Sequence, residues 1–123
     1  MKELLLKDLC SRMPYNTKIQ LTEYSVTGKK LPSEIKILDY CMLGKVQAYC
    51  KGFRKDEVKP YLFPLASMTP KQKAELAHLT ADIDGIFEQV LAEIEFYHRH
   101  HIDYQGLIPL GLAIDATGLG IYD

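Results

Sequence analysis

The sequence divides at Lys59-Pro60-Tyr61-Leu62-Phe63-Pro64-Leu65-Ala66-Ser67-Met68-Thr69-Pro70, a proline-punctuated stretch between two differently patterned halves. Because a proline ring fixes φ and restricts the residue before it, Pro60 and Pro64 should keep the connection extended. The pattern Thr69-Pro70-x-Gln72 is a helix start, with a capping threonine, a proline at the first helical position and a glutamine that bonds back. We predict a structural joint here, without catalytic chemistry.

Charge is distributed unevenly on the two sides of this joint. Residues 1–27 carry four basic and three acidic side chains, residues 28–60 carry eight and four, and residues 61–123 carry three and nine. The net charges are therefore +1, +4 and −6. The basic middle and the acidic C-terminal half should attract each other, and attraction to a polyanion could only be local.

Length and composition indicate one α+β domain spanning residues 1–123. The chain has 123 residues, of which 47% are hydrophobic and 25% charged, as in ordinary globular proteins. No window approaches the roughly 18 apolar residues of a membrane helix. The N-terminus interrupts its apolar run with charges and lacks a signal-peptide cleavage pattern. We expect a cytoplasmic protein without membrane contact.

Apolar spacing predicts the elements of the N-terminal half. Leu5 and Leu9 fit an amphipathic helix over residues 2–12, which ends before Pro14. A strand is predicted over residues 17–27, and two more over 35–43 and 46–53, joined by a hairpin at Gly44-Lys45. The core side of that hairpin is predicted to carry this set: Ile37, Cys41, Leu43, Val46, Ala48 and Cys50. The other side carries this one: Leu38, Tyr40, Met42, Gln47, Tyr49 and Lys51.

The C-terminal half is predicted to be helical and then extended. A helix over residues 70–81 is followed by a break at 82–85. Apolar residues then recur at helical spacing up to Tyr97, which predicts a second helix to about residue 101 and makes it the main core helix. Residues 103–114 are too rich in glycine and proline for a long helix, and they should form an extended apolar tail packed on the core.

These elements predict an α+β fold. The expected order is an N-terminal helix, a three-stranded antiparallel sheet, two C-terminal helices packed on one face of the sheet, and the tail. The three cysteines, Cys10, Cys41 and Cys50, have no metal-binding spacing, and their odd number argues against a disulfide framework. They are expected to be buried, reduced thiols.

A cluster near the end of the last helix is the candidate for metal or acid/base chemistry. His98, His101 and Asp103 are the candidate ligands, since imidazoles and carboxylates suit divalent transition metals. At 100° per residue, His100 points away from the other two histidines. The favoured interpretation is that His101 is a neutral core or helix-end histidine. A metal-dependent hydrolase remains the third hypothesis, and no cofactor is expected.

The basic middle, residues 28–60, is the candidate surface for single-stranded nucleic acid. Cations along a path with aromatic platforms are what such a ligand requires. The candidate contacts are Lys29, Lys30, Lys45, Tyr49, Lys51, Arg54 and Lys55. A solvated strand face is the favoured alternative, because lysine and tyrosine are ordinary there and three acidic side chains dilute the field.

Catalytic motifs are missing from the sequence. It contains no dinucleotide-binding glycine pattern, Walker loop, nucleophile elbow or zinc-protease motif. The serines and cysteines have no recognisable activating context. An enzyme is therefore not favoured, and no catalytic residue is assigned.

Three segments carry a resemblance to a protein group. They are Met1-Lys2-Glu3-Leu4-Leu5-Leu6-Lys7-Asp8-Leu9-Cys10, then Val58 to Leu62 with Ser67-Met68-Thr69, then Asp103 to Ile108 with Gly111-Leu112-Ala113. In order and spacing the chain resembles small uncharacterised proteins from prophage and mobile-element regions of gut Bacteroidetes. Phe63 and Gln105 stand where members of that group often have arginine. The resemblance implies an accessory protein of a phage or mobile element, with no known activity to transfer.

The leading functional hypothesis is a protein-protein interaction module that binds another protein or itself. It rests on the missing catalytic set and on apolar residues on both faces of the predicted hairpin. Leu38, Tyr40 and Met42 would form the exposed patch. Binding of single-stranded nucleic acid through the basic sheet is the alternative.

Overall fold

The stretch that divides the sequence forms the central strand of the sheet. In the computed structural model, which describes residues 2–51 and 56–123, strand β3 spans Glu57–Pro64. It pairs antiparallel with β1 (Lys18–Thr22) and parallel with β4 (Ile102–Asp103) and β5 (Ile114–Asp115). The predicted joint is extended up to Pro64, as expected, and Leu65–Ser67 then form a 3₁₀ turn. The strand also holds both halves of the chain together.

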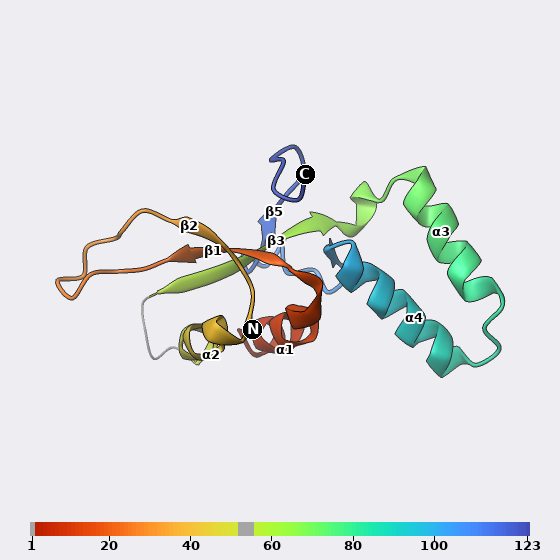
Figure 1. The fold of residues 1–123 in the computed structure, drawn as a ribbon, viewed down its shortest axis with the longest axis horizontal. Coiled ribbons are helices and arrows are strands. Elements are labelled where there is room, and N and C mark those ends of the chain that lie inside the picture. The colour runs from red at the N-terminus through yellow and green to blue at the C-terminus, as the bar shows by residue number, and fades with distance from the viewer. Residues whose placement is uncertain (1, 52–55) are drawn as a thin grey trace.

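The remaining elements follow in a simple order (Figure 1). The helices are α1 (Lys2–Arg12), α2 (Leu43–Cys50), α3 (Pro70–Ala81) and α4 (Ile86–Arg99). Strand β2 spans Glu34–Ile37, and short 3₁₀ turns cover Met13–Tyr15, Tyr40–Met42 and Leu65–Ser67. The α+β class is confirmed. No helix in the described ranges combines the length and apolar character needed to cross a membrane.

The predicted three-stranded antiparallel sheet is wrong. The sheet has five strands and is mixed, with the order β2-β1-β3-β4 and β5 paired to β3. The two parallel strands come from the C-terminal segment, where each has only two residues. Such short strands leave no alternating pattern in a sequence, so the tail showed its apolar character but not its pairing.

The predicted hairpin at Gly44-Lys45 is also wrong. Strand β2 ends at Ile37, and the Asp39 side chain then accepts a hydrogen bond from the Met42 amide at 3.2 Å, which starts a helical turn. Helix α2 continues from it and buries Val46 and Tyr49, three residues apart. Because the segment is short, alternation and helical spacing are both present in it, and packing against α1 decides for the helix. Predicted strand residues 52 and 53 lie outside the described residues.

This change alters which of residues 38–50 are buried, although Val46 lies in the core as predicted. Leu38 and Met42, predicted to lie on the open face, are 1% and 8% exposed and belong to the core. Tyr40 alone of the predicted patch is exposed. Cys41, predicted to be in the core, is exposed, as is Cys10, while Cys50 is half-buried, and all three are free thiols. The predicted interaction surface is therefore not formed.

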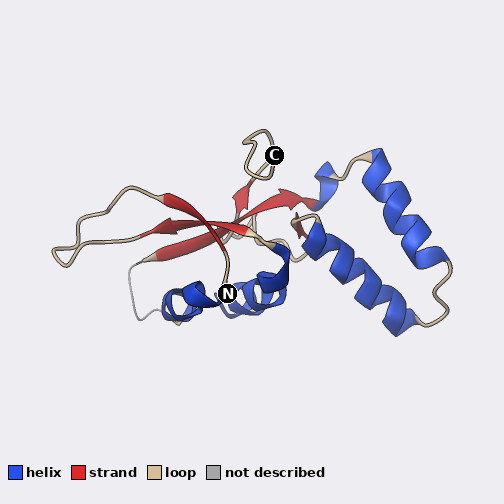
Figure 2. Ribbon diagram, viewed as in Figure 1, coloured by secondary structure: helices blue, strands red, loops and turns tan. Residues whose placement is uncertain are grey.

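One face of the sheet carries the core. Figure 2 shows α1 and α2 side by side on one side of the strands, with the C-terminal loop on the other. Leu5 and Leu9 of α1 pack there on Ile19 and Leu21 of β1. Leu62 of β3 is fully buried in the same cluster, so this strand holds the centre of the core.

Helices α3 and α4 do not pack on the sheet as predicted. They form a hairpin that projects from the end of β3 away from the strands, and we call residues 70–99 the arm (Figure 1). The predicted capping box is confirmed, since Thr69 accepts from the Gln72 amide at 3.1 Å and Gln72 accepts from the Thr69 amide at 3.0 Å. Yet α3 has no buried residue, and α4 buries only Phe96 and His98 near its base.

Truncation of the central strand should be far more costly than truncation of the arm. Leu62→Ala removes a side chain with 0% exposure and should lower the free energy of unfolding by about 2–5 kcal/mol. Leu79→Ala, on α3 with 42% exposure, should cost less than about 1 kcal/mol. Urea unfolding compares the two, and equal losses would show that the core is not centred on β3.

Candidate interaction surface

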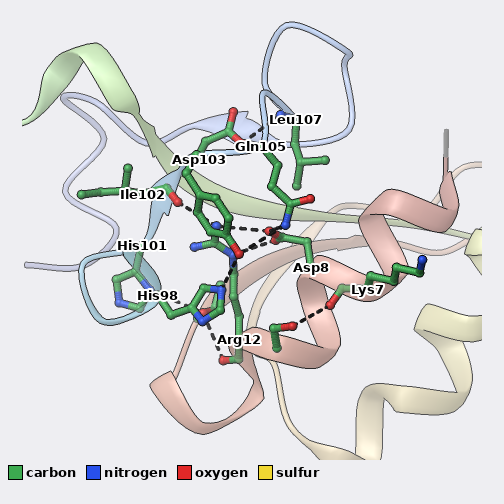
Figure 3. Close-up of polar contacts among 12 residues, drawn as sticks. Lys7, Asp8, Arg12, His98, His101, Ile102, Asp103, Gln105 and Leu107 are labelled. Carbon is green, nitrogen blue, oxygen red and sulfur yellow. Dashed lines mark hydrogen bonds and ion pairs between the residues drawn. The ribbon is translucent and has the colours of Figure 1, made fainter. Parts of the chain in front are cut away.

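A buried ion pair lies at the base of the arm (Figure 3). Asp8 and Arg12 are four residues apart on α1, and both side chains are 0% exposed. Arg12 donates through Nε to Asp8 Oδ2 at 2.7 Å and through Nη2 to Oδ1 at 3.2 Å, a bidentate contact. Burial raises the pKa of Asp8, and the Arg12 hydrogen bond and charge oppose that rise.

The ion pair ties α1 to the segment that follows the arm. Arg12 Nη2 also donates to the carbonyl of Ile102 at 2.7 Å, across 90 residues of sequence. Gln105 Nε2 donates to Asp8 Oδ1 at 3.1 Å, so both members of the pair reach the C-terminal half. Arg12 Nη1 is buried and has no hydrogen-bond partner among the described residues. These contacts fix where α4 leaves the body.

His98, a predicted metal ligand, belongs to the same group of polar contacts. We call this group the polar junction, and its members are Asp8, Arg12, His98, Ile102, Tyr104 and Gln105. His98 lies on the last turns of α4, 5% exposed, with Nε2 2.9 Å from the Tyr104 hydroxyl. Burial and then the nearby Arg12 charge lower the pKa of His98 to about 4. The imidazole is therefore neutral near pH 7, and it holds the base of α4 against the loop after β4.

His101, the second predicted ligand, closes the helix. Its φ of 56° places it in the left-handed region, immediately after the helix end. Its backbone carbonyl accepts from the Phe63 amide at 2.8 Å, and its ring stacks on Tyr122 at 3.8 Å between centroids. Nδ1 lies 3.4 Å from the Thr17 hydroxyl. Burial and then Arg12 lower the pKa of His101 to about 4, as for a neutral, half-buried helix-end histidine.

Asp103, the third predicted ligand, has its carboxylate engaged by backbone. Its two oxygens accept from the amides of Leu107 at 2.8 Å and Ile108 at 2.9 Å. Three predicted ligands are thus near one another in the fold but bonded to different partners. Among the described residues, no group of three or more histidine, cysteine, aspartate and glutamate side chains could hold a metal ion.

The predicted nucleic-acid contacts do not share a sheet face. Lys29 and Lys30 lie in the connection between β1 and β2, while three others lie on or just after α2. These three are Lys45, Tyr49 and Lys51. Tyr49 is 7% exposed with Lys2 Nζ 4.2 Å from its ring centroid, so it offers no platform for a base. Lys45 pairs with Glu23 at 3.3 Å. Arg54 and Lys55 lie outside the described residues.

The outer face of α4 carries exposed apolar side chains. Ile86 is 80% exposed, Phe87 71%, Val90 45% and Leu91 51%. At 100° per residue the four lie within an arc of about 140°, and we call them the arm stripe. The face toward α3 is a different one, where Phe96 and Leu79 line a shared groove. Helix α3 therefore leaves the arm stripe uncovered.

The arm that presents this stripe is acidic. Residues 70–99 contain three basic side chains, Lys71, Lys73 and Arg99, against six acidic ones. The acidic residues are Glu75, Asp82, Asp84, Glu88, Glu93 and Glu95. An apolar strip with an acidic rim is suited to an apolar partner surface with basic residues around it.

Comparisons with known proteins add no information to this geometry. No family model, no curated protein and no solved structure matches the chain.

The sequence did not reveal the polar junction. It did show the helical spacing of the arm stripe, which we interpreted as a core face. The spacing of Leu5, Asp8, Leu9 and Arg12 on one helix face was a usable signal, since all four are buried. Charges at two such positions indicate a buried pair. The arm stripe was detected by its helical spacing and assigned to the core.

Breaking the ion pair should destabilise the protein strongly. Arg12→Met leaves the Asp8 carboxylate buried without its counterion and should lower the free energy of unfolding by about 3–5 kcal/mol. Adding Asp8→Leu should recover part of that loss. Lys36→Met, which breaks an exposed pair with Glu34, is the matched control and should cost less than about 1 kcal/mol. Urea unfolding measures the stability of all variants. An equal loss of stability in the single and the double variant would contradict this prediction.

Acid should destabilise the fold through the two histidines. Their pKa values lie near 4 in the folded protein and near 6.5 in an unstructured peptide, so the unfolded chain binds more protons between these values. The stability that His98 and His101 contribute is complete above pH 6.5 and falls as pH drops toward 4. At pH 5, unfolding should take up roughly two protons on their account.

Histidine variants isolate this effect. His98→Gln with His101→Gln should flatten the dependence of unfolding free energy on pH between 4.5 and 6.5. Denaturant unfolding across that range measures the slopes. A double variant with the wild-type slope would contradict the assignment.

Proposed function

We propose that this chain is a protein-protein interaction module whose binding element is the arm. The observation that supports the proposal is the arm stripe, in which four large apolar side chains on one helix are 45–80% exposed. Contiguous exposed apolar residues with a polar rim are typical of interaction sites. The stripe belongs to a regular helical hairpin whose first helix has a capping box, so its exposure is a built feature of the fold.

Helix physics favours a partner for the arm. Helices of 12 and 14 residues are marginal in water on their own, and most of their stability comes from packing an apolar face. The contact between α3 and α4 buries little, because no residue between 70 and 95 is buried. A partner that covers the arm stripe would supply the missing burial.

The base of the arm is suited to hold the arm stripe in a fixed position for a partner. His98 contacts Tyr104, while Arg12 contacts the carbonyl of Ile102, so the root of α4 is held on both sides by the body. A fixed root reduces the conformational freedom that binding would have to remove. The phage or mobile-element setting, nucleic-acid binding and a metal-dependent hydrolase stay predictions with less geometric support.

Site-specific photocrosslinking tests the proposal. A photoreactive phenylalanine derivative replaces Phe87 in the arm stripe, and in a matched protein it replaces Lys71 on the exposed side of α3. After irradiation in the native host, position 87 should give a discrete adduct and position 71 should not. The adduct should disappear when Val90→Asp and Leu91→Asp place charges beside the crosslinker, because apolar burial drives the contact.

Two results would overturn the proposal. One is equal crosslinking from positions 71 and 87, which indicates random collision. The other is an adduct from position 87 that survives the two aspartates. Circular dichroism of the charged variant shows whether it keeps its helices, as expected for exposed sites.

A further inference from the structure

The second face of the sheet carries exposed apolar residues on β2, beside the part where the C-terminal loop packs. In the antiparallel register Gln20 lies opposite Ile35 and Lys59, so these three share a sheet face, and Ile37 lies two residues from Ile35 on the same face. Ile35 is 54% exposed and Ile37 49%. We call these four residues the open sheet face. It lies opposite the core face, where Ile19 and Leu21 are buried.

The open sheet face and the arm stripe are complementary in charge. Lys59 belongs to the open sheet face, against one acid, Glu57, further along β3. Lys18 pairs with Ile37 beside it, and its ammonium also donates to the carbonyl of Ile121 at 2.6 Å. The arm has three more acidic than basic residues. A helix with an acidic rim therefore matches a strand surface with basic residues among its isoleucines.

The arm cannot cover this face within its own molecule as folded. It leaves the body at the end of β3 and extends away from β2, while the connection between β1 and β2 forms the opposite end of the molecule (Figure 1). We infer that the arm stripe of one copy docks on the open sheet face of a second copy. The inference rests on the proposed function and names the occupant of the binding element.

Charge disfavours the simpler pairing of arm with arm. Two arms side by side would bring Glu88, Glu93 and Glu95 of one α4 near the same residues of the other. The arm-to-sheet contact avoids this repulsion and also covers Ile35 and Ile37, the exposed apolar residues of the open sheet face. When each copy gives one arm and receives one, the arm-to-sheet contact occurs twice and the dimer is closed by two-fold symmetry.

A mixing experiment tests the inference. The arm variant is Phe87→Asp with Val90→Asp, and the sheet variant is Ile35→Asp with Ile37→Asp. Light scattering over a concentration series should show self-association of the wild type and a dissociation constant raised at least about 100-fold in each variant. An equimolar mixture of the two should associate again, because it contains one intact arm and one intact sheet. All four sites are at least 45% exposed, so the fold should persist.

Controls keep the outcomes separate. Leu110→Asp with Leu119→Asp places the same charges on exposed apolar residues of the tail and should leave association unchanged. If aspartate melts β2, seen as a lowered midpoint in circular dichroism, Ile35→Thr with Ile37→Thr replaces it because threonine keeps the strand preference.

Four results would overturn the inference, and one of them would also overturn the proposed function. A sheet variant that associates like the wild type, or a mixture that stays monomeric, overturns the arm-to-sheet contact. A monomeric wild type that still gives an adduct from position 87 means that another protein occupies the arm, and the proposed function stands. A monomeric wild type without that adduct overturns both.

Discussion

The buried pair of Asp8 and Arg12 is the interaction on which the arrangement of the molecule depends. Its desolvation is costly, and a buried ion pair is often no more stable than an apolar replacement. The pair fixes the position of the C-terminal segment, because the Arg12 guanidinium also binds the Ile102 carbonyl and the Asp8 carboxylate also binds Gln105. An apolar pair could fill the space but would not fix which part of the C-terminal segment lies against α1.

That constraint carries through to the arm. Ile102 comes directly after His101, whose left-handed backbone conformation ends α4. The His101 carbonyl accepts a hydrogen bond from the Phe63 amide of β3. Both ends of the arm therefore meet on β3, one by chain connection and the other by hydrogen bonds. The base of the hairpin also contacts the body through His98, whose ring lies against Tyr15 and Tyr104, so the direction of the hairpin is set at this root. The neutral histidines suit the site, because a second cation beside Arg12 would oppose the ion pair.

The sequence predicts elements well where a local chemical signal exists. Helix α3 follows from Thr69, Pro70 and Gln72, whose capping contacts need no tertiary partner. Residues 43–50 carry no such signal, and only packing of Val46 and Tyr49 against α1 selects a helix over a strand. The polar junction spans 97 positions between Asp8 and Gln105, so pattern could locate its members on their helices but not bring them together.

Helix α4 shows what periodicity can and cannot report. Its spacing of Ile86, Val90 and Phe87 is that of a core helix, and the sequence gives no sign of which surface it should meet. Apolar spacing records that a face must be covered, and the covering surface can belong to the same chain or to another. In this fold the root fixed by Arg12 points α4 away from its own sheet while that sheet keeps Ile35 and Ile37 open. Two exposed apolar faces are therefore built into one chain, and the arm-to-sheet contact that we propose would cover both.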